Sequence, residues 1–155
     1  MTVHFICRGN ALRSLIAEAY LRSLGISDLE VMSSGTVANE YKTANKVNFQ
    51  RTRTLLRRHG IEQFAKDHYA DQLQKSQPII GDVVVCMNRR AYDECMQLGK
   101  LPKYTLVWDI TDIGEPGRIP SSVAERWKYM EDVYQEIVQD VDRLVRQLGL
   151  AGAAV

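Results

Sequence analysis

Short apolar runs alternate with longer segments of helical periodicity along this chain of 155 residues. Apolar runs of four to eight residues between turn residues are typical of buried strands, whereas apolar residues spaced three and four apart indicate one face of a helix. The predicted strands are residues 2–6, 29–32, 82–86 and 104–108, and the predicted helices are 14–24, 45–59, 88–98 and 122–148.

Turn residues and a capping pattern mark the boundaries of these elements. Ser122 and Glu125 have the spacing of a capping box at the start of the last helix. Two glycines and two prolines predict a loop at 109–121, and a short helical segment is expected at 70–75. A glycine follows three predicted helices, at the position where helices commonly end: Gly25, Gly60 and Gly149.

Strands that alternate with helices predict an α/β domain with a parallel sheet. We expect a three-layer α/β/α architecture with a four-stranded parallel sheet, one domain over 1–149 and a frayed tail at 150–155. Ligands of such folds bind at the carboxyl ends of the strands. Cys7 follows the first strand, and Asp109 and Asp112 follow the fourth, so they are expected at the same edge of the sheet.

Composition and charge narrow the possible functions. The chain is 45% hydrophobic with a net charge of +1, which is enough for one core and gives no basic surface for nucleic acid or membranes. No membrane span or signal peptide is predicted, and three cysteines fit a reducing compartment, so we expect a cytoplasmic monomer or weak homodimer. The cysteines and histidines do not have the spacing of metal ligands, so no metal site is predicted, and no cofactor is expected. Four arginines of one helix are interpreted as a solvated face: Arg51, Arg53, Arg57 and Arg58.

The segment Cys-Arg-Gly-Asn-Ala-Leu-Arg-Ser at residues 7–14 joins the first predicted strand to the first predicted helix. Backbone N–H groups of such a loop can bind an anion. Cys7 is a candidate nucleophile, because a helix N-terminus and a nearby cation favour the thiolate. Arg13 can bind two phosphate oxygens, and the Ser14 hydroxyl can donate to the thiolate.

Gly9 and Asn10 suit a loop that folds closely around a ligand, because glycine lets the backbone approach it and asparagine tolerates left-handed dihedral angles. The predicted phosphate-binding residues are Arg8, Gly9, Asn10, Ala11, Leu12, Arg13 and Ser14. Phosphate ester cleavage also needs an acid for the leaving oxygen. The residues alone leave three candidates open: Asp112, Asp109 and Glu115.

From its first strand to its last helix, the chain resembles the low-molecular-weight protein tyrosine phosphatases. The phosphate loop of that family reads Cys-x-Gly-Asn-x-Cys-Arg-Ser and is usually followed by Pro-Ile-Ala-Glu-Ala, which residues 7–19 match except at positions 12 and 15 among the specified residues. Segments 33–36, 82–88 and 108–112 resemble later family motifs. The resemblance implies a four-stranded parallel sheet, no metal, a hydrogen bond from Asn10 to Ser33, and Asp112 as the acid.

Besides the mild change at Leu15, which replaces a proline, further departures concern the site. Leu12 replaces a second cysteine, so the disulfide that protects the nucleophile should be absent. Ile113 replaces the proline of the acid loop, and the tyrosines that stack on an aryl substrate are missing. Arg8 adds a charge at the rim, where it either favours a more anionic substrate or points to solvent.

The sequence therefore predicts a phosphatase that hydrolyses phosphomonoesters through a phosphocysteine at Cys7. Protein phosphotyrosine is the first expected substrate, and phosphoarginine and a small phosphomonoester are variants of the same prediction. One alternative is a thiol-dependent arsenate reductase, which would need Cys86 and Cys95 as a disulfide relay, although Cys86 is predicted to be buried and inert. The other is a phosphate-binding protein without turnover.

Overall fold

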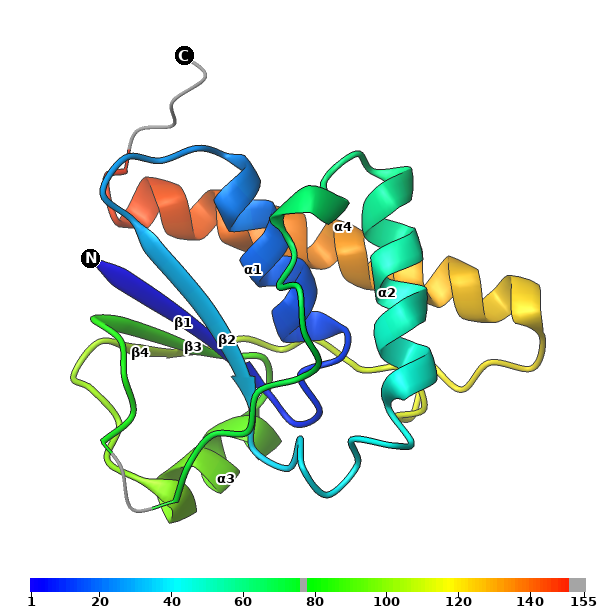
Figure 1. Cartoon of the computed structure of the whole chain (residues 1–155), viewed down its shortest axis with the longest axis horizontal. Helices are drawn as coiled ribbons and strands as arrows, with labels where there is room; N and C mark the ends of the chain where they lie inside the picture. Colours follow the sequence, from blue (N-terminus) through cyan, green and yellow to red (C-terminus); the bar gives the residue numbers. More distant parts are fainter. Residues whose placement is uncertain (76–77, 151–155) are drawn as a thin grey trace.

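A computed structural model of the chain describes residues 1–75 and 78–150, so the last five residues of the predicted tail lie outside the described part. Four strands and four α-helices alternate, with a short 3₁₀ helix, η1, before the third strand (Figure 1). The elements are β1 (Thr2–Cys7), α1 (Arg13–Ser23), β2 (Glu30–Gly35), α2 (Lys46–Arg58), η1 (Glu62–Phe64), β3 (Val83–Cys86), α3 (Arg89–Leu98), β4 (Thr105–Val107) and α4 (Val123–Gln147).

The four strands form one parallel sheet in the order β2-β1-β3-β4, which confirms the predicted sheet. Strand β1 lies between β2 and β3, with Cys7 beside Gly35 on one side and Ile6 beside Cys86 on the other. After β1 the chain forms β2 on one side of it, and the later strands β3 and β4 lie on the other side. The loop after β1 therefore opens at the switch point of the sheet, where ligands of α/β folds bind.

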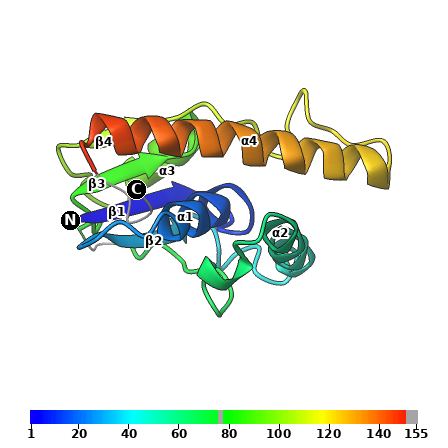
Figure 2. The same ribbon diagram turned by 90° about the horizontal axis from the view of Figure 1, so that it is seen from above.

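Helices cover both faces of the sheet, as expected for three layers. Helices α1 and α4 lie against one face and α3 against the other, while α2 stands beyond α1 (Figures 1 and 2). Alternate residues of β1 enter different cores: Phe5 packs toward Ile137 and the other α4 residues, and Ile6 packs toward Ala91 of α3. The buried strand thus carries apolar side chains on both faces.

The expected helix at 70–75 is wrong. The segment is extended, since Gly35 donates to the Asp71 carbonyl at 2.8 Å and Leu73 donates to the Gly35 carbonyl at 2.9 Å. Gln72 forms an isolated parallel bridge with Gly35. Pairing with the end of β2 satisfies these backbone groups better than one isolated helical turn would. No pattern in the sequence indicated η1 at Glu62–Phe64.

Both ends of α4 differ in detail from the prediction. Ser122 Oγ accepts from Glu125 N at 3.0 Å, but the Glu125 carboxylate accepts from the backbone of Ser121 instead of returning to Ser122. At the other end, Leu150 N–H donates to the Val145 carbonyl at 3.0 Å, which with the positive φ of the preceding glycine makes a Schellman motif. Leu150 is therefore held by the helix end and is not part of a frayed tail.

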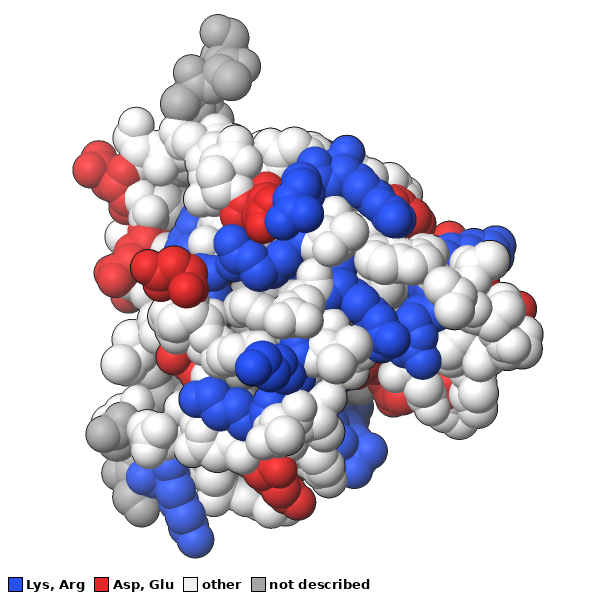
Figure 3. Space-filling view, turned by 45° about the vertical axis from the view of Figure 1, so that its right-hand side comes forward, with Lys and Arg blue, Asp and Glu red and all other residues white. Residues whose placement is uncertain are grey.

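The four arginines of α2 only partly form the expected solvated face, because Arg57 and Arg58 are exposed whereas Arg51 and Arg53 are half-buried. Figure 3 shows Lys and Arg side chains spread over one face of the molecule, with Asp and Glu side chains between them and at its edges. Glu62 lies 3.4 Å from Arg53 and 2.6 Å from Arg57, Arg58 lies over the Trp127 ring, and Arg51 donates to Asn48. Among the described residues, no helix is long and apolar enough to cross a membrane.

Candidate active site

The thiol of Cys7 lies under the loop that connects β1 to α1. Cys7 is the last residue of β1 and is 3% exposed. Its Sγ accepts from the backbone N–H of Asn10 at 3.2 Å and lies 3.0 Å from Ser14 Oγ. Since α1 begins at Arg13, the positive end of the helix faces the same loop. The loop thus places the Asn10 N–H and the Ser14 hydroxyl around the sulfur.

Asn10 holds this loop in shape. Its φ of +52° places it in the left-handed region, and its Nδ2 donates to Ser14 Oγ at 2.8 Å and to Ser33 Oγ at 2.9 Å. The hydrogen bond to Ser33 that the resemblance implied is therefore present. Gly35 permits the close approach of β2 to the loop, since a Cβ there would lie 2.5 Å from the Arg8 carbonyl oxygen.

Lys66 supports the loop from behind, a contact that the sequence did not predict. Its Nζ donates to Asn10 Oδ1 at 2.8 Å, to the Ser33 carbonyl at 3.0 Å and to Asp71 Oδ2 at 2.8 Å. Asp71 N–H also donates to Asn10 Oδ1, at 2.9 Å. Asn10 thus has both of its amide atoms engaged. A buried lysine in an irregular segment leaves no periodic signal, so sequence reasoning had no means of finding it.

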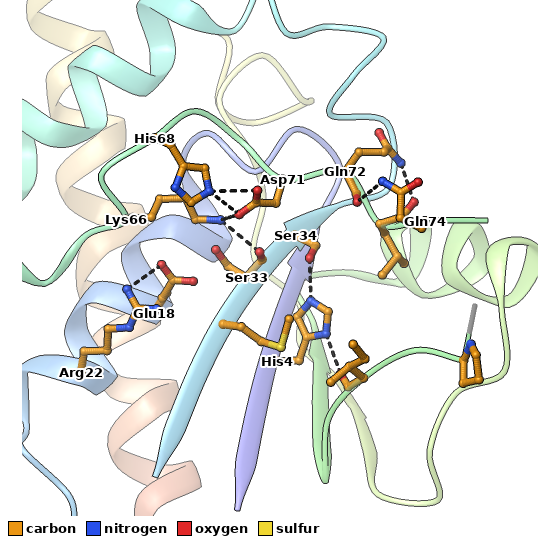
Figure 4. A pocket seen from close by; sticks show the side chains of 14 residues that line it. His4, Glu18, Arg22, Ser33, Ser34, Lys66, His68, Asp71, Gln72 and Gln74 are labelled. Atoms are coloured by element: carbon orange, nitrogen blue, oxygen red, sulfur yellow. Dashed lines mark hydrogen bonds and ion pairs between the residues drawn. The ribbon is translucent and has the colours of Figure 1, made fainter. Parts of the chain in front are cut away.

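The charges around Lys66 influence one another (Figure 4). Burial acts to raise the pKa of Asp71, but hydrogen bonds from Lys66 and His68 hold it below its usual range. Hydrogen bonds to Asp67 and Asp71 raise the pKa of His68. Lys66, His68 and Asp71 line a pocket of about 270 Å³ that does not include Cys7. The pocket lies behind the loop, and its lining contributes loop support.

Arg13 reaches from the start of α1 to the loop after β4. Its side chain is 2% exposed, with Nη1 donating to the Ile110 carbonyl at 3.0 Å and Nη2 to Asp112 Oδ2 at 3.3 Å. Its Nε is buried and has no hydrogen-bond partner among the described residues. A buried donor left unpaired costs about 1–3 kcal/mol, which an oxygen of a bound anion would recover.

The structure brings two of the three candidate acids to this arginine. Asp112 is paired with Arg13, and its own N–H donates to Glu115 Oε1 at 2.7 Å, while Glu115 lies 3.8 Å from Arg13 Nη1. Asp109 is exposed and does not line the pocket that contains Cys7. The geometry thus places Asp112, and not Asp109, beside Arg13 in the pocket that contains Cys7.

The acid loop is held without the proline of the family pattern. The Ile113 N–H donates to Asp112 Oδ1 at 2.8 Å, which fixes the carboxyl group. Arg118 donates to the Thr111 carbonyl at 2.6 Å and forms an ion pair with Glu136 of α4. The role of Arg118 was not predicted, because its partners are distant in sequence or are backbone atoms.

The thiol opens into a pocket of about 150 Å³ between the phosphate loop, the acid loop, α2 and α4. Gly9 lies against Asn45, since a Cβ at Gly9 would come within 2.5 Å of Asn45 Nδ2. The pocket is lined by Cys7, Gly9, Ala11, Leu12, Arg13, Asn45, Asn48, Thr52, Asp112, Ile113, Arg126 and Met130. The predicted residues Asn10 and Ser14 support it from below. The lining at α2 and Arg126 was not predicted.

Arg8 does not point freely to solvent, which corrects that expectation, and it does not line the pocket that contains Cys7. Whether it favours a more anionic substrate stays a prediction. Its Nε lies 2.8 Å from Glu94 Oε1, and the same oxygen accepts from Thr36 Oγ1 at 3.1 Å. The hydrogen bond to Glu94 raises the pKa of Arg8. Arg8 therefore ties the rim of the loop to α3 and reaches only the adjacent surface groove.

The other two cysteines do not have the properties of a reactive cysteine pair. Cys86 and Cys95 are both fully buried, and the hydrogen bond with Cys86 raises the pKa of Cys95. A buried thiol with a raised pKa is a poor nucleophile. Among residues 1–75 and 78–150, no group of three or more His, Cys, Asp or Glu side chains could hold a metal ion.

Comparisons with known structures agree with this fold. Wzb of Vibrio vulnificus, solved with benzylphosphonate, has a TM-score of 0.73 and 17% identity, covering 94% of this chain and 97% of its own. The tyrosine phosphatase Wzb of Escherichia coli K30, solved with sulphate, has a TM-score of 0.67 and 20% identity, with coverage of 95% and 97%. The YwlE arginine phosphatase of Geobacillus stearothermophilus has a TM-score of 0.60 and 20% identity, with coverage of 96% and 92%.

A search of the curated proteins found no match. A family model described as low molecular weight phosphotyrosine protein phosphatase matches residues 2–153, which is nearly the whole chain. The fold, the thiol beneath an anion loop and the paired arginine and carboxyl group agree with that match. The chain belongs to the low molecular weight phosphotyrosine protein phosphatase family.

Proposed function

We propose that this phosphatase hydrolyses phosphomonoesters through a covalent phosphocysteine at Cys7. The observation that carries the proposal is the buried Nε of Arg13, which lacks a partner among the described residues and belongs to the guanidinium that holds Asp112. A phosphate in the loop would satisfy this donor and would lie between the thiol and the carboxyl group. Nucleophile, anion donor and acid then converge on one ligand.

The residues provide both steps of such a reaction. The Cys7 thiolate attacks phosphorus, the bond to the ester oxygen breaks, and protonated Asp112 gives its proton to that oxygen. Asp112, now a carboxylate, takes a proton from water, which attacks phosphorus and breaks the bond to sulfur. The Ser14 hydroxyl, 3.0 Å from Sγ, stabilises the departing thiolate. Arg13 and the loop N–H groups hold the phosphate oxygens in both steps.

Protein phosphotyrosine is the substrate that the family resemblance suggests. Leu12, Ile113 and Met130 provide apolar wall for an aryl group, although no aromatic side chain lines the pocket in the described part of the chain. A phosphoarginine would bring its guanidinium group near Arg126, which lines the same pocket. Like charges at close range disfavour that substrate. The arsenate reductase alternative is not favoured, because its relay would need the buried Cys86 and Cys95.

Hydrolysis of p-nitrophenyl phosphate by wild type and Cys7→Ser tests the proposal. We expect turnover by the wild type, competitive inhibition by orthovanadate and phosphate, and no turnover by Cys7→Ser. Equal turnover by the two proteins would overturn the mechanism, and tight phosphate binding without turnover would identify a binding protein. A panel of phosphotyrosine, phosphoarginine and phosphoserine peptides and arsenate then compares the substrate classes.

A further inference from the structure

Arg126 is a cationic side chain in the pocket that contains Cys7, and no role has been assigned to it so far. It lies in the first turns of α4, is half-buried, and lines the pocket together with Cys7 and Asp112. Within residues 1–75 and 78–150, its side chain makes no hydrogen bond or ion pair. The other arginine of the pocket, Arg13, already binds Asp112. Arginines that are partly removed from water are normally paired, so Arg126 lacks a counter-charge.

The wall contributed by α2 is also rich in donors. Asn48 Oδ1 accepts from Arg51 at 3.0 Å, and Asn45 Oδ1 accepts from Asn48 Nδ2 at 3.5 Å. Both amide oxygens are thus occupied, while Asn45 Nδ2 lies beside Gly9 at the pocket. Asn45 is also the residue that precedes the first turn of α2, where the helix dipole favours negative charge. Asp112 is the one acidic residue of the pocket lining in the described part of the chain.

We propose that the substrate carries a carboxylate on the leaving group, and that Arg126 binds this carboxylate while Arg13 binds the phosphate. The inference rests on the proposed phosphomonoester hydrolysis and names a substrate class that differs from protein phosphotyrosine, because a tyrosine side chain carries no carboxylate. The planar guanidinium suits a carboxylate because it can form two parallel hydrogen bonds. Arg126 lines the same pocket of about 150 Å³ as Cys7, so a carboxylate near the ester oxygen would lie close to it. An uncharged leaving group would bury Arg126 without a partner.

Pairs of aryl phosphates that differ only in the charge of the leaving group test whether Arg126 binds a carboxylate. We compare 4-carboxyphenyl phosphate with 4-carbamoylphenyl phosphate, and the corresponding 3-substituted pair, because carboxylate and amide have nearly the same shape. For at least one pair, wild type should prefer the carboxylate by about tenfold in kcat/KM, which corresponds to about 1.4 kcal/mol. Arg126→Met should bring that ratio close to one, and Arg126→Lys should restore part of it. Arg146→Met, at the exposed far end of α4, should keep the wild-type ratio.

Two outcomes overturn the inference: a wild-type ratio near one for both pairs, or a preference that survives in Arg126→Met. Phosphotyrosine peptides with Glu or Gln beside the phosphotyrosine form a third arm. A charge preference there, without one in the small pairs, would place the anion on a neighbouring residue and overturn the leaving-group assignment.

A binding measurement separates this inference from the proposed function. Calorimetry measures how tightly Cys7→Ser binds 4-carboxybenzylphosphonate and its carbamoyl analogue, and then the corresponding 3-substituted compounds. The same measurements are made with the double variant that carries both Cys7→Ser and Arg126→Met. If wild type hydrolyses none of the esters, the proposed function fails, while an Arg126-dependent preference for the carboxylate in binding still supports the inference. Turnover of the esters without any charge preference leaves the proposed function standing and refutes the inference.

Discussion

Nη2 of Arg13 lies 3.3 Å from Oδ2 of Asp112 and so joins the phosphate loop to the acid loop, 99 positions further along the chain. The same guanidinium presents its unpaired Nε inside the site. One side chain therefore orients the carboxyl group and offers a donor to the anion. This relationship places Asp112 beside the guanidinium that we propose binds the phosphate.

Substitution of Asp112 tests its role as the acid. Asp112→Asn should lower kcat by about 10²–10⁴ with little change in KM, because an amide cannot exchange the proton. The loss should be smaller for aryl phosphates with acidic phenols, which need less protonation. Steady-state kinetics with Asp109→Asn as the matched control should give wild-type rates. A collapse in Asp109→Asn with normal rates in Asp112→Asn would reassign the acid.

Gly35 should be essential for the shape of the phosphate loop. In Gly35→Ala the new Cβ would meet Arg8 O at 2.5 Å and Asn10 N at 2.9 Å, both of them backbone atoms that cannot move without distorting the loop. We expect a loss of about 1–3 kcal/mol in stability, as for other overpacked sites, together with a large loss of activity.

Gly60→Ala is the matched control for this substitution. Gly60 has a φ of +73°, and an added Cβ would meet no atom within 4 Å, so alanine there adds only backbone strain of about 1–2 kcal/mol. Urea unfolding and kcat/KM should therefore both change in Gly35→Ala, whereas stability alone should change in Gly60→Ala. Similar activity losses in the two variants would contradict the steric account.

Lys66 should couple stability to phosphate binding. Lys66→Met keeps the length of the side chain but removes the donors to Asn10, Ser33 and Asp71. Unpaired acceptors should cost about 1–3 kcal/mol in the free energy of unfolding. Phosphate affinity should also fall, because Asn10 loses part of its support. Lys128→Met, on the exposed face of α4, should leave both quantities unchanged, and an unaltered phosphate affinity in Lys66→Met would refute the coupling.

His4 should make folding sensitive to acid. Its Nδ1 donates to the Ile80 carbonyl at 2.7 Å, so Nε2 accepts from the Ser34 hydroxyl, and burial lowers its pKa to about 4. The unfolded chain binds this proton near pH 6.5, so the stabilisation is complete above that pH and is lost as the pH falls toward 4. The neutral, buried His4 therefore contributes about 3 kcal/mol to the free energy of unfolding above pH 6.5.

The measurement is the free energy of unfolding of wild type and His4→Asn between about pH 4 and 7, taken by urea titration. His4→Asn should be less stable at neutral pH and should show a flatter dependence on pH in this window. Parallel pH profiles for the two proteins would show that another group titrates.

The sheet and its helices were predictable because their signals are local. β1 is a mainly apolar run, and α4 repeats apolar residues such as Val133, Ile137 and Val141 at helical spacing. The phosphate loop was predictable for the same reason, since nucleophile, anion donor and helix start all fall within residues 7–14. The segment 70–75 was misassigned because its partner, Gly35, is distant in sequence and outweighs its local propensity.

The supports of the site could not be predicted, because they join distant positions. Lys66 meets Asn10 across 56 positions, and Arg8 meets Glu94 across 86. Such pairs leave no periodicity, and a single sequence does not reveal which charges meet. Arg126 belongs to the same class, since its place in the pocket depends on how α4 packs beside the acid loop and α2.

Trapping the covalent intermediate tests the central claim most directly. Wild type is mixed with an aryl phosphate, quenched in acid within the first turnover, digested and analysed by mass spectrometry. We predict that one phosphoryl group is attached to the peptide that contains Cys7, that Asp112→Asn accumulates more of this species, and that Cys7→Ala has none. Turnover with no phosphorylated Cys7 peptide, or a phosphoryl group on another residue, would contradict the account.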